Sequence, residues 1–245
     1  MHRSDRSAEA AAVSRVPPPW RLRGSGYVFL FTFKPWFLRS GGFVPPELGE
    51  GFEGQLGALV LAEYRLSPVG PYRELLFLAG RNRRWRNHRF SITRAYVSTE
   101  ASAVNGRENW GIPKQTAEFE VIQGKDGAER VIVLRDGLAE VDLKVAPAGG
   151  LPLPAVSLLT PPSWRTIVQF RDGKAYETRS SGRGMLRLAS LLDFRTLPTA
   201  FPDLNKGELV GGFRLAALRL RLPRSRRLQG AGPTTRAESS GVRER

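Results

Sequence analysis

The residues best able to do chemistry in this sequence are a lysine and the acidic and aromatic groups near it, because the usual nucleophiles are scarce. The chain of 245 residues has no cysteine and only two histidines, His2 and His88. A zinc site of the Cys/His type and a cysteine nucleophile cannot be assembled from this set. No G-x-S-x-G pattern accompanies His88 to suggest a serine-histidine-aspartate triad. We therefore expect no metal and no cofactor.

Lys114 stands in the stretch GRENWGIPKQTAEFEV, residues 106–121. Pro113 fixes its own backbone and biases Ile112 toward an extended conformation, so the lysine lies at the entry of a predicted strand. Alternation along this strand groups the lysine with the polar residues Thr116, Glu118 and Glu120. The pattern favours a charge on a solvated strand face, although a polar-lined barrel interior would give the same alternation. Spacing alone leaves both interpretations open.

Five positions of the stretch match a known catalytic motif: Gly106, Arg107, Glu108, Pro113 and Lys114. They resemble the acetoacetate decarboxylase family, whose motif is Gly-Arg-Glu, four variable residues and Pro-Lys. Upstream, SPVGPYREL resembles the Tyr-x-Glu element of the family and identifies Glu74 as the matching glutamate. The spacing between this glutamate and the lysine also fits. The resemblance extends over residues 20–220 and is most specific over 60–122.

The resemblance implies that Lys114 forms a Schiff base with a small keto acid or related carbonyl compound, and that the iminium accepts the electrons released as carbon dioxide leaves. It implies that Glu74 is a nearby acid, base or positioning group. Tyr72, Arg107 and Trp110 are candidates for substrate binding. From the residues alone, Glu74 is equally a strand-end carboxylate paired with an arginine. By the same interpretation, Arg107 orders the loop through charge-assisted hydrogen bonds, and Tyr72 and Trp110 are ordinary core residues.

Three departures from the family pattern bear on the reaction. Gln115 stands where the family has a second lysine, Leu59 where its decarboxylases have a second glutamate, and an expected arginine aligns near Ser25. A lysine nucleophile must lack its proton, and an unperturbed lysine has a pKa of about 10.4. A second cation about 6 Å away would disfavour the ammonium by roughly 2.8 kcal/mol. Full burial alone can lower the pKa of a lysine by about 3 to 5, so Schiff-base chemistry stays open without the second lysine.

The elements that must position these residues are mostly strands. Residues 26–33, 56–66 and 72–80 are rich in the apolar, aromatic and β-branched residues typical of buried sheet. Asp136-Gly137 and Asp172-Gly173 predict tight antiparallel hairpins. One helix is expected over STEASAVNG, residues 98–106, with Ser98 as the N-cap and Asn105-Gly106 as the stop. The stretch GMLRLASLLDF, residues 184–194, fits either a helix or a strand.

These elements predict a mainly β, β-rich α+β protein with few short helices. We expect one antiparallel β-barrel domain of the acetoacetate decarboxylase-like type over residues 20–222. Residues 1–19 are expected to be a disordered lead and residues 223–245 a disordered, arginine-rich tail. The resemblance further implies a homo-oligomer.

The net charge of +15 suggests a nucleic-acid partner, but much of the excess lies in the segment Arg81–Arg89 and in the tail. A solvated loop and tail is the simpler interpretation, so we expect no specific nucleic acid. Nor do we expect a membrane span or a secretory signal, because no apolar run approaches about 18 residues. The predicted location is the cytoplasm. Three functions stay open: a Schiff-base lyase, a non-catalytic β-barrel that binds an apolar ligand, and a basic nucleic-acid-binding protein.

Overall fold

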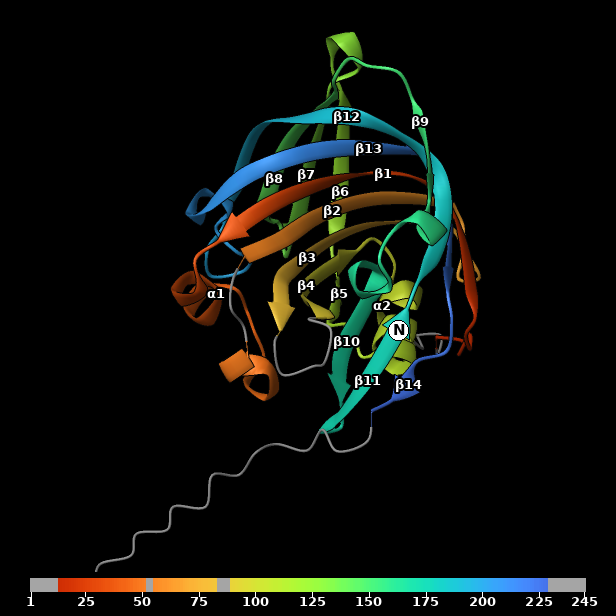
Figure 1. Ribbon diagram of the computed structural model, residues 1–245. Helices are drawn as coiled ribbons and strands as arrows, with labels where there is room; N and C mark the ends of the chain where they lie inside the picture. Colours follow the sequence, from red (N-terminus) through yellow and green to blue (C-terminus); the bar gives the residue numbers. More distant parts are fainter. Residues whose placement is uncertain (1–12, 52–54, 83–88, 229–245) are drawn as a thin grey trace, which may run out of the picture.

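The computed structural model describes residues 13–51, 55–82 and 89–228, and it is mainly β (Figure 1). The long strands are β1 (Trp20–Phe33), β2 (Gln55–Leu66), β3 (Tyr72–Asn82), β4 (Arg89–Val97), β8 (Leu138–Pro147), β12 (Ser181–Thr196) and β13 (Gly207–Leu222). The shorter strands are β5 (Lys114–Thr116), β6 (Glu118–Gln123), β7 (Glu129–Arg135), β9 (Leu153–Val156), β10 (Thr166–Arg171), β11 (Lys174–Arg179) and β14 (Arg226–Arg227). The α-helices of the described residues are α1 (Pro35–Gly41) and α2 (Glu100–Trp110).

The strands form one 14-stranded sheet that does not close on itself within the described residues. Its order is β14-β11-β10-β4-β3-β2-β1-β13-β12-β8-β7-β6, with β5 paired to β4 and β9 paired to β12. The predicted closed barrel is therefore not confirmed, because β6 and β14 end the path without pairing to each other. Most pairs are antiparallel, as predicted, but β5 and β10 both run parallel to β4. Figure 1 shows the long central strands curving around α2.

The two predicted Asp-Gly hairpins are confirmed. Asp136 and Gly137 join β7 to β8 with φ of 51° and 76°, and Asp172 and Gly173 join β10 to β11 with φ of 51° and 68°. Positive φ at both central residues is the turn geometry that matches the twist of two antiparallel strands. The undecided stretch at residues 184–194 is part of β12 and thus a strand.

The curved sheet separates two apolar cores, because residues alternate between its faces. On β2, Leu59 and Leu61 face the larger core, which also contains the side chains of β6, β7 and β8. Ala62 and Tyr64 face the smaller core, which is closed by α2. The members of the smaller core are Trp20, Leu22, Ala62, Tyr64, Tyr72, Ile92, Ala95, Val97, Ala103, Trp110 and Ile112.

Both described ends of the chain pack against α2. Val16 donates its backbone N–H to Asn105 Oδ1 at 2.7 Å, and its carbonyl oxygen accepts from Asn109 Nδ2 at 2.8 Å. Near the other end, Ser225 Oγ donates to the carbonyl oxygen of Asn109 at 3.0 Å. These segments belong to the stretches that the sequence analysis assigned to the lead and the tail. Residues 1–12 and 229–245 lie outside the described residues, so the predictions for them stay predictions.

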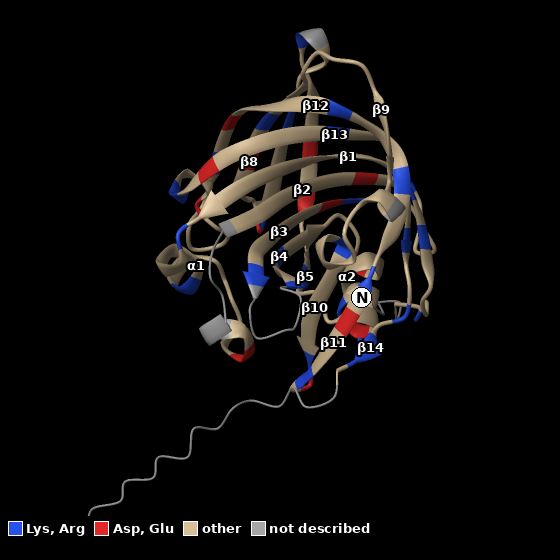
Figure 2. Cartoon of the chain, viewed as in Figure 1, with Lys and Arg blue, Asp and Glu red and all other residues tan. Residues whose placement is uncertain are grey.

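Figure 2 shows acidic and basic residues spread along the strands and turns of the chain. Of the arginine-rich segment Arg81–Arg89, residues 83–88 lie outside the described residues. None of the helices in the part of the chain that is described is long and apolar enough to cross a membrane.

Candidate active site around Lys114

Helix α2 is longer than predicted and begins one residue later than its predicted N-cap implied. Thr99 is the N-cap, and its side-chain oxygen accepts from the backbone N–H of Ser102 at 3.3 Å. The helix continues through the predicted stop at Asn105-Gly106 and ends at Trp110, with Gly111 as the C-cap at φ 68°. The predicted boundaries, Ser98 and Gly106, were therefore wrong. Gly111 takes the left-handed conformation that glycine adopts without strain.

Gly106 is needed for contact with Lys114, not for ending the helix. A Cβ at this position would lie 2.4 Å from Cδ and 2.9 Å from Cε of Lys114. Glycine inside a helix costs about 1 kcal/mol relative to alanine, and here it makes room for the lysine stem to lie against the helix backbone.

Lys114 is buried, which contradicts the interpretation as a charge on a solvated strand face. Its side chain is 2% exposed, whereas the other five lysines of the chain are all exposed. The alternation used for that interpretation breaks at Ala117, which lies between β5 and β6. Strand β5 pairs with β4, where Lys114 is opposite Ala95, while β6 pairs with β7. The lysine thus belongs to the smaller core and the glutamates of β6 to another surface.

The amine of Lys114 contacts one carboxylate and one hydroxyl. Nζ lies 2.6 Å from Glu74 Oε1, and the Glu74 side chain is only 5% exposed. Nζ also donates to Ser102 Oγ at 3.1 Å. The ring of Tyr72 lies 5.1 Å from Nζ, a distance that permits a cation–π contact. The alternative of an exposed Glu74 paired with an arginine is therefore wrong, because its partner is the buried lysine.

Two tyrosines enclose the lysine–glutamate pair. Tyr64 and Tyr72 are opposite each other on β2 and β3, with ring centroids 5.0 Å apart. Burial, followed by the negative charge of Glu74, raises the pKa of both phenols well above 10.0, the ordinary value. Both hydroxyls thus keep their protons at neutral pH. The Tyr72 hydroxyl is buried beside Ser102 but makes no hydrogen bond of ordinary geometry within the described residues.

Of the other predicted site residues, neither Arg107 nor Trp110 contacts the amine among the described interactions. Arg107 Nη1 donates to the carbonyl oxygen of Lys114 at 2.6 Å, and its Nη2 lies 3.3 Å from Glu100 Oε1. Arg107 therefore holds the backbone at the start of β5. Trp110 is 1% exposed, packs edge-on against Trp20 with centroids 4.9 Å apart, and donates Nε1–H to the carbonyl oxygen of Pro223. It is a core residue that fastens the end of α2.

Two of the positions that differ from the family pattern face away from Lys114. Leu59 is fully buried in the larger core, on the face of β2 opposite to that of Ala62, the residue paired with Glu74. Gln115, next in sequence to the lysine, accepts from Arg135 Nη1 at 3.1 Å and from Arg94 Nη1 at 3.5 Å. An apolar residue at position 59 thus leaves the surroundings of the amine unchanged.

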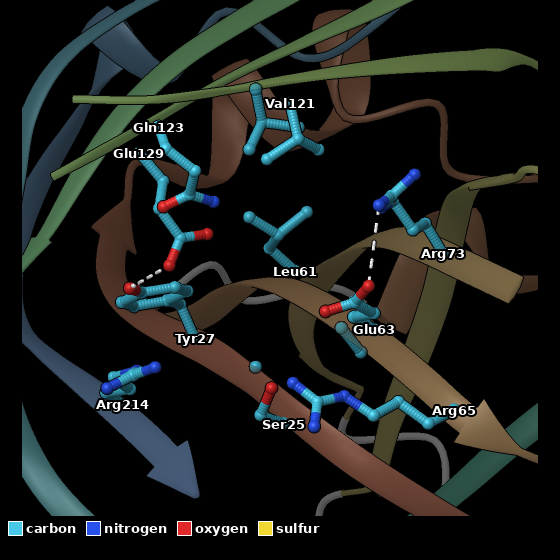
Figure 3. Close-up of a pocket in the computed structure, with 13 residues that line it drawn as sticks. Ser25, Tyr27, Leu61, Glu63, Arg65, Arg73, Val121, Gln123, Glu129 and Arg214 are labelled. Carbon is cyan, nitrogen blue, oxygen red and sulfur yellow. Dashed lines mark hydrogen bonds and ion pairs between the residues drawn. The ribbon is translucent and has the colours of Figure 1, made fainter. Parts of the chain in front are cut away.

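Ser25, the third such position, lines a cavity of about 280 Å³ that lies between the curved sheet and β6–β7 (Figure 3). In this cavity Tyr27 donates its hydroxyl to Glu129 Oε1 at 3.1 Å, and Arg73 lies 3.4 Å from Glu63. None of these groups contacts Lys114 within the described structure.

Beside the lysine site itself, a hollow of about 320 Å³ at the end of the β2–β3 hairpin is lined by Tyr64, Tyr72 and Ser98, among others. No group of three or more His, Cys, Asp or Glu side chains among the described residues is arranged to hold a metal ion.

Sequence reasoning missed Ser102 and Tyr64. Ser102 lies one helical turn before Gly106, so both face the lysine. Both were inside the predicted helix, but Gly106 was interpreted as its stop instead of as a position on the face toward Lys114. Tyr64 is symmetric with Tyr72 about the hairpin centre at Pro68, as Ala62 is with Glu74. Pairing residues outward from the turn would have found it.

Comparison with known proteins supports the fold assignment. The chain superposes on acetoacetate decarboxylase from Legionella pneumophila with a TM-score of 0.63 at 17% identity, covering 86% of this chain and 88% of that one. The enduracididine biosynthesis enzyme MppR, in a structure complexed with pyruvate, gives a TM-score of 0.60 at 16% identity, covering 89% and 93%. The chain has the acetoacetate decarboxylase-like fold. The resemblance predicted from GRENWGIPK and Tyr72-x-Glu74 is thereby confirmed at the level of the fold.

Among curated relatives, this acetoacetate decarboxylase-like chain is similar to the plant protein NEOXANTHIN-DEFICIENT 1. It is 34% identical to the tomato (Solanum lycopersicum) protein over 104 residues, which are 42% of this chain and 35% of that protein. The match thus spans about a third of the length of this relative. No family model matches the chain.

Proposed function

We propose that this protein is a Schiff-base lyase that uses Lys114 to form an imine with a small keto acid or related carbonyl compound. The observation that carries the proposal is the buried amine, 2.6 Å from a buried carboxylate and 3.1 Å from a serine hydroxyl. Burial disfavours charge on both partners. A proton that moves from Nζ to Glu74 leaves a neutral amine beside a neutral acid, and a neutral amine is the nucleophile that imine formation needs.

In the proposed reaction, the lysine nitrogen adds to the substrate carbonyl carbon and forms a carbinolamine. Glu74 returns its proton to the departing hydroxyl, which leaves as water and gives the iminium. In a keto acid, the bond from the adjacent carbon to the carboxylate then breaks and carbon dioxide leaves. In a β-hydroxy aldehyde or ketone, the carbon–carbon bond to the hydroxyl-bearing carbon breaks, Glu74 takes the hydroxyl proton, and an aldehyde leaves. In both cases the electron pair enters the iminium system and an enamine forms. Protonation of the enamine carbon and addition of water release the product and the free lysine. Glu74 serves as base and acid in turn because its carboxylate contacts Lys114 Nζ, the nitrogen that becomes part of the imine.

Hydroxyl groups beside the amine are the proposed orienting groups. Ser102 hydrogen-bonds the nucleophile directly and holds Nζ toward Glu74. Tyr72 offers a buried hydroxyl whose raised pKa keeps it a donor at neutral pH. We infer that it donates to the substrate oxygen as the carbinolamine forms, since a buried donor without a partner gains most from a new hydrogen bond.

The charges around the amine favour an uncharged carbonyl compound over a keto acid. Among the described contacts, Glu74 is the one acidic neighbour of the Lys114 amine, and no arginine contacts that amine or the Glu74 carboxylate. A substrate carboxylate placed here would be desolvated near Glu74 without a cation to balance it. The pyruvate bound to the structural relative MppR supports a carbonyl substrate in general, and the missing cation directs the proposal to aldehydes and ketones.

A second candidate function is the binding of an apolar ligand without catalysis. The apolar members of the smaller core around the lysine favour it. The departures at Leu59 and near Ser25 add no support, because neither position contacts Lys114 in the described structure. The predictions of a homo-oligomer and of a cytoplasmic location stay predictions.

Borohydride trapping separates the two candidates. The protein is incubated with acetoacetate, pyruvate, acetone or a small aldehyde, reduced, and mapped by mass spectrometry. A reduced adduct on Lys114 that is lost in Glu74→Gln and is stronger with the uncharged compounds is the expected result. No adduct on Lys114 with any carbonyl compound would exclude the Schiff-base proposal and leave ligand binding as the function.

A further inference from the structure

One row of side chains crosses five neighbouring strands on the outer face of the sheet. The strand register places Arg23 of β1 opposite Arg219 of β13, and Arg219 opposite Arg183 of β12. Leu66 of β2 extends the row beyond Arg23, and Val156 of β9 extends it beyond Arg183. All five side chains are exposed, Leu66 to 58% and Val156 to 41%. We call these five residues the arginine row.

A second pair of arginines lies beside the row on the same face. Arg21 is opposite Arg221, two residues along β1 and β13 from the row, and both are exposed. Leu22 and Leu220, which alternate with them, face the smaller core instead. Neighbouring strands are about 4.8 Å apart and alternate residues about 6.8 Å apart, so five guanidinium groups share a small, sheet-like surface. Figure 2 shows basic residues gathered where β12 and the adjacent strands bend at the right of the view.

These arginines are not balanced by acidic neighbours. Across the described residues, no ion pair joins any of the three arginines of the row, or Arg21 and Arg221 beside it, to an aspartate or glutamate. Like charges directly opposite each other on adjacent strands destabilise a sheet. The arrangement therefore becomes favourable when an external anion lies against it. A second copy of the same face would bring more guanidinium groups and is not that partner.

The apolar side chains around the row identify the kind of anion. Beyond Val156, two short turns carry Leu159 and Trp164, which are 81% and 52% exposed. The first turn is fastened to β12, since Gly182 N–H donates to Ser157 Oγ at 3.0 Å. Arginine beside exposed leucine, valine and tryptophan is the composition of a membrane-interface anchor. A nucleic-acid backbone would use the arginines but would give Leu66 and Val156 no apolar partner.

We propose that the arginine row docks this protein on the surface of an anionic lipid bilayer. The guanidinium groups contact lipid phosphates, and the apolar ends of the row enter the boundary between headgroups and acyl chains. The proposal is independent of the imine chemistry. The inner face of the same strands forms part of the smaller core, so docking would hold the Lys114 site close to apolar compounds dissolved in the bilayer.

Two charge-matched variants test the proposal in the full chain. The row variant carries Arg23→Gln, Arg183→Gln and Arg219→Gln. The control variant removes the same charge from exposed positions elsewhere on the surface, by Arg39→Gln, Lys125→Gln and Lys206→Gln. A third variant, Leu66→Ser with Val156→Ser, removes the apolar ends and keeps the charge. Removing opposed arginines relieves repulsion, so the row variant is expected to fold.

Co-sedimentation is measured with vesicles of phosphatidylcholine alone and of phosphatidylcholine with phosphatidylglycerol. The wild type is expected to bind only the anionic vesicles and to bind less at higher salt. Each arginine near an anionic surface strengthens binding by about fivefold, so the row variant, which lacks three, should bind on the order of a hundredfold more weakly. The control variant should stay close to wild type. The apolar variant should also bind more weakly.

Equal binding by row and control variants, or an unchanged apolar variant, overturns the proposal. Loss of binding to a single-stranded oligonucleotide in the row variant, with vesicle binding intact, would assign the surface to nucleic acid instead.

Discussion

Replacing Lys114 with methionine is expected to destabilise the fold far more than a change at an exposed lysine. The ammonium lies 2.6 Å from Glu74, and the two side chains are 2% and 5% exposed. Methionine fills similar space but leaves a buried carboxylate without its cation, which costs about 3 to 5 kcal/mol. Since 1 kcal/mol changes the Tm of a domain of this size by about 2 to 4 °C, the Tm should fall by roughly 6 to 20 °C.

Urea unfolding of a double-mutant cycle measures this energy. Lys114→Met and Glu74→Leu should each destabilise strongly, whereas the double variant should recover most of the loss, because a buried ion pair replaced by apolar residues is often neutral or stabilising. Lys125→Met, at an exposed lysine, is the control and should change the free energy of unfolding by no more than about 0.5 kcal/mol. A Lys114→Met cost below about 1 kcal/mol, or a double variant equal to the sum of the singles, would refute the buried pair.

Three further outcomes follow from the structure. Gly106→Ala, whose Cβ would lie 2.4 Å from Lys114 Cδ, should cost about 1 to 3 kcal/mol and slow borohydride trapping while the circular dichroism stays native; an unchanged trapping rate would contradict the contact. Gly111→Ala should destabilise by about 1 to 3 kcal/mol, because φ is 68° and the new Cβ would lie 2.8 Å from the carbonyl oxygen of Phe170; a neutral result in urea unfolding would rule this out. Tyr64 and Tyr72 keep their protons in the folded state and lose them near pH 10 in the unfolded state, so stability should fall as pH rises above 10, and phenolate absorbance should rise together with unfolding. Ionisation of every tyrosine while the protein is still folded would contradict this prediction.

Local signals were sufficient to predict several strands and two turns. The Asp-Gly pairs fix hairpins by backbone preference alone, and the apolar, aromatic and β-branched residues of 26–33, 56–66 and 72–80 mark buried strands. The pairing of Lys114 with Glu74 was also predictable, but only through the resemblance, because 40 residues separate them in sequence. Their contact depends on β3 and β5 both lying beside β4.

The burial of Lys114 could not be derived from its own neighbourhood. Strand alternation grouped it with glutamates, and Asn105-Gly106 had the composition of a helix stop. In the fold, tertiary contact takes precedence over both patterns: the helix continues to Trp110, and Gly106 receives the lysine side chain. The same limit applies to Leu59, which stands where decarboxylases of the family have a second glutamate. The odd separation of Leu59 from Ala62, the residue opposite Glu74, places the leucine on the other face of β2.

The central claim is that one lysine of the chain is a nucleophile, and site-resolved borohydride trapping tests it most directly. The chain has six lysines, and five of them are exposed, so they report non-specific reaction in the same sample. With limiting acetone or aldehyde near neutral pH, we predict that the reduced adduct forms on Lys114 faster than on any exposed lysine, and that Glu74→Gln removes this preference. Adducts spread over the exposed lysines with Lys114 unmodified would contradict the account.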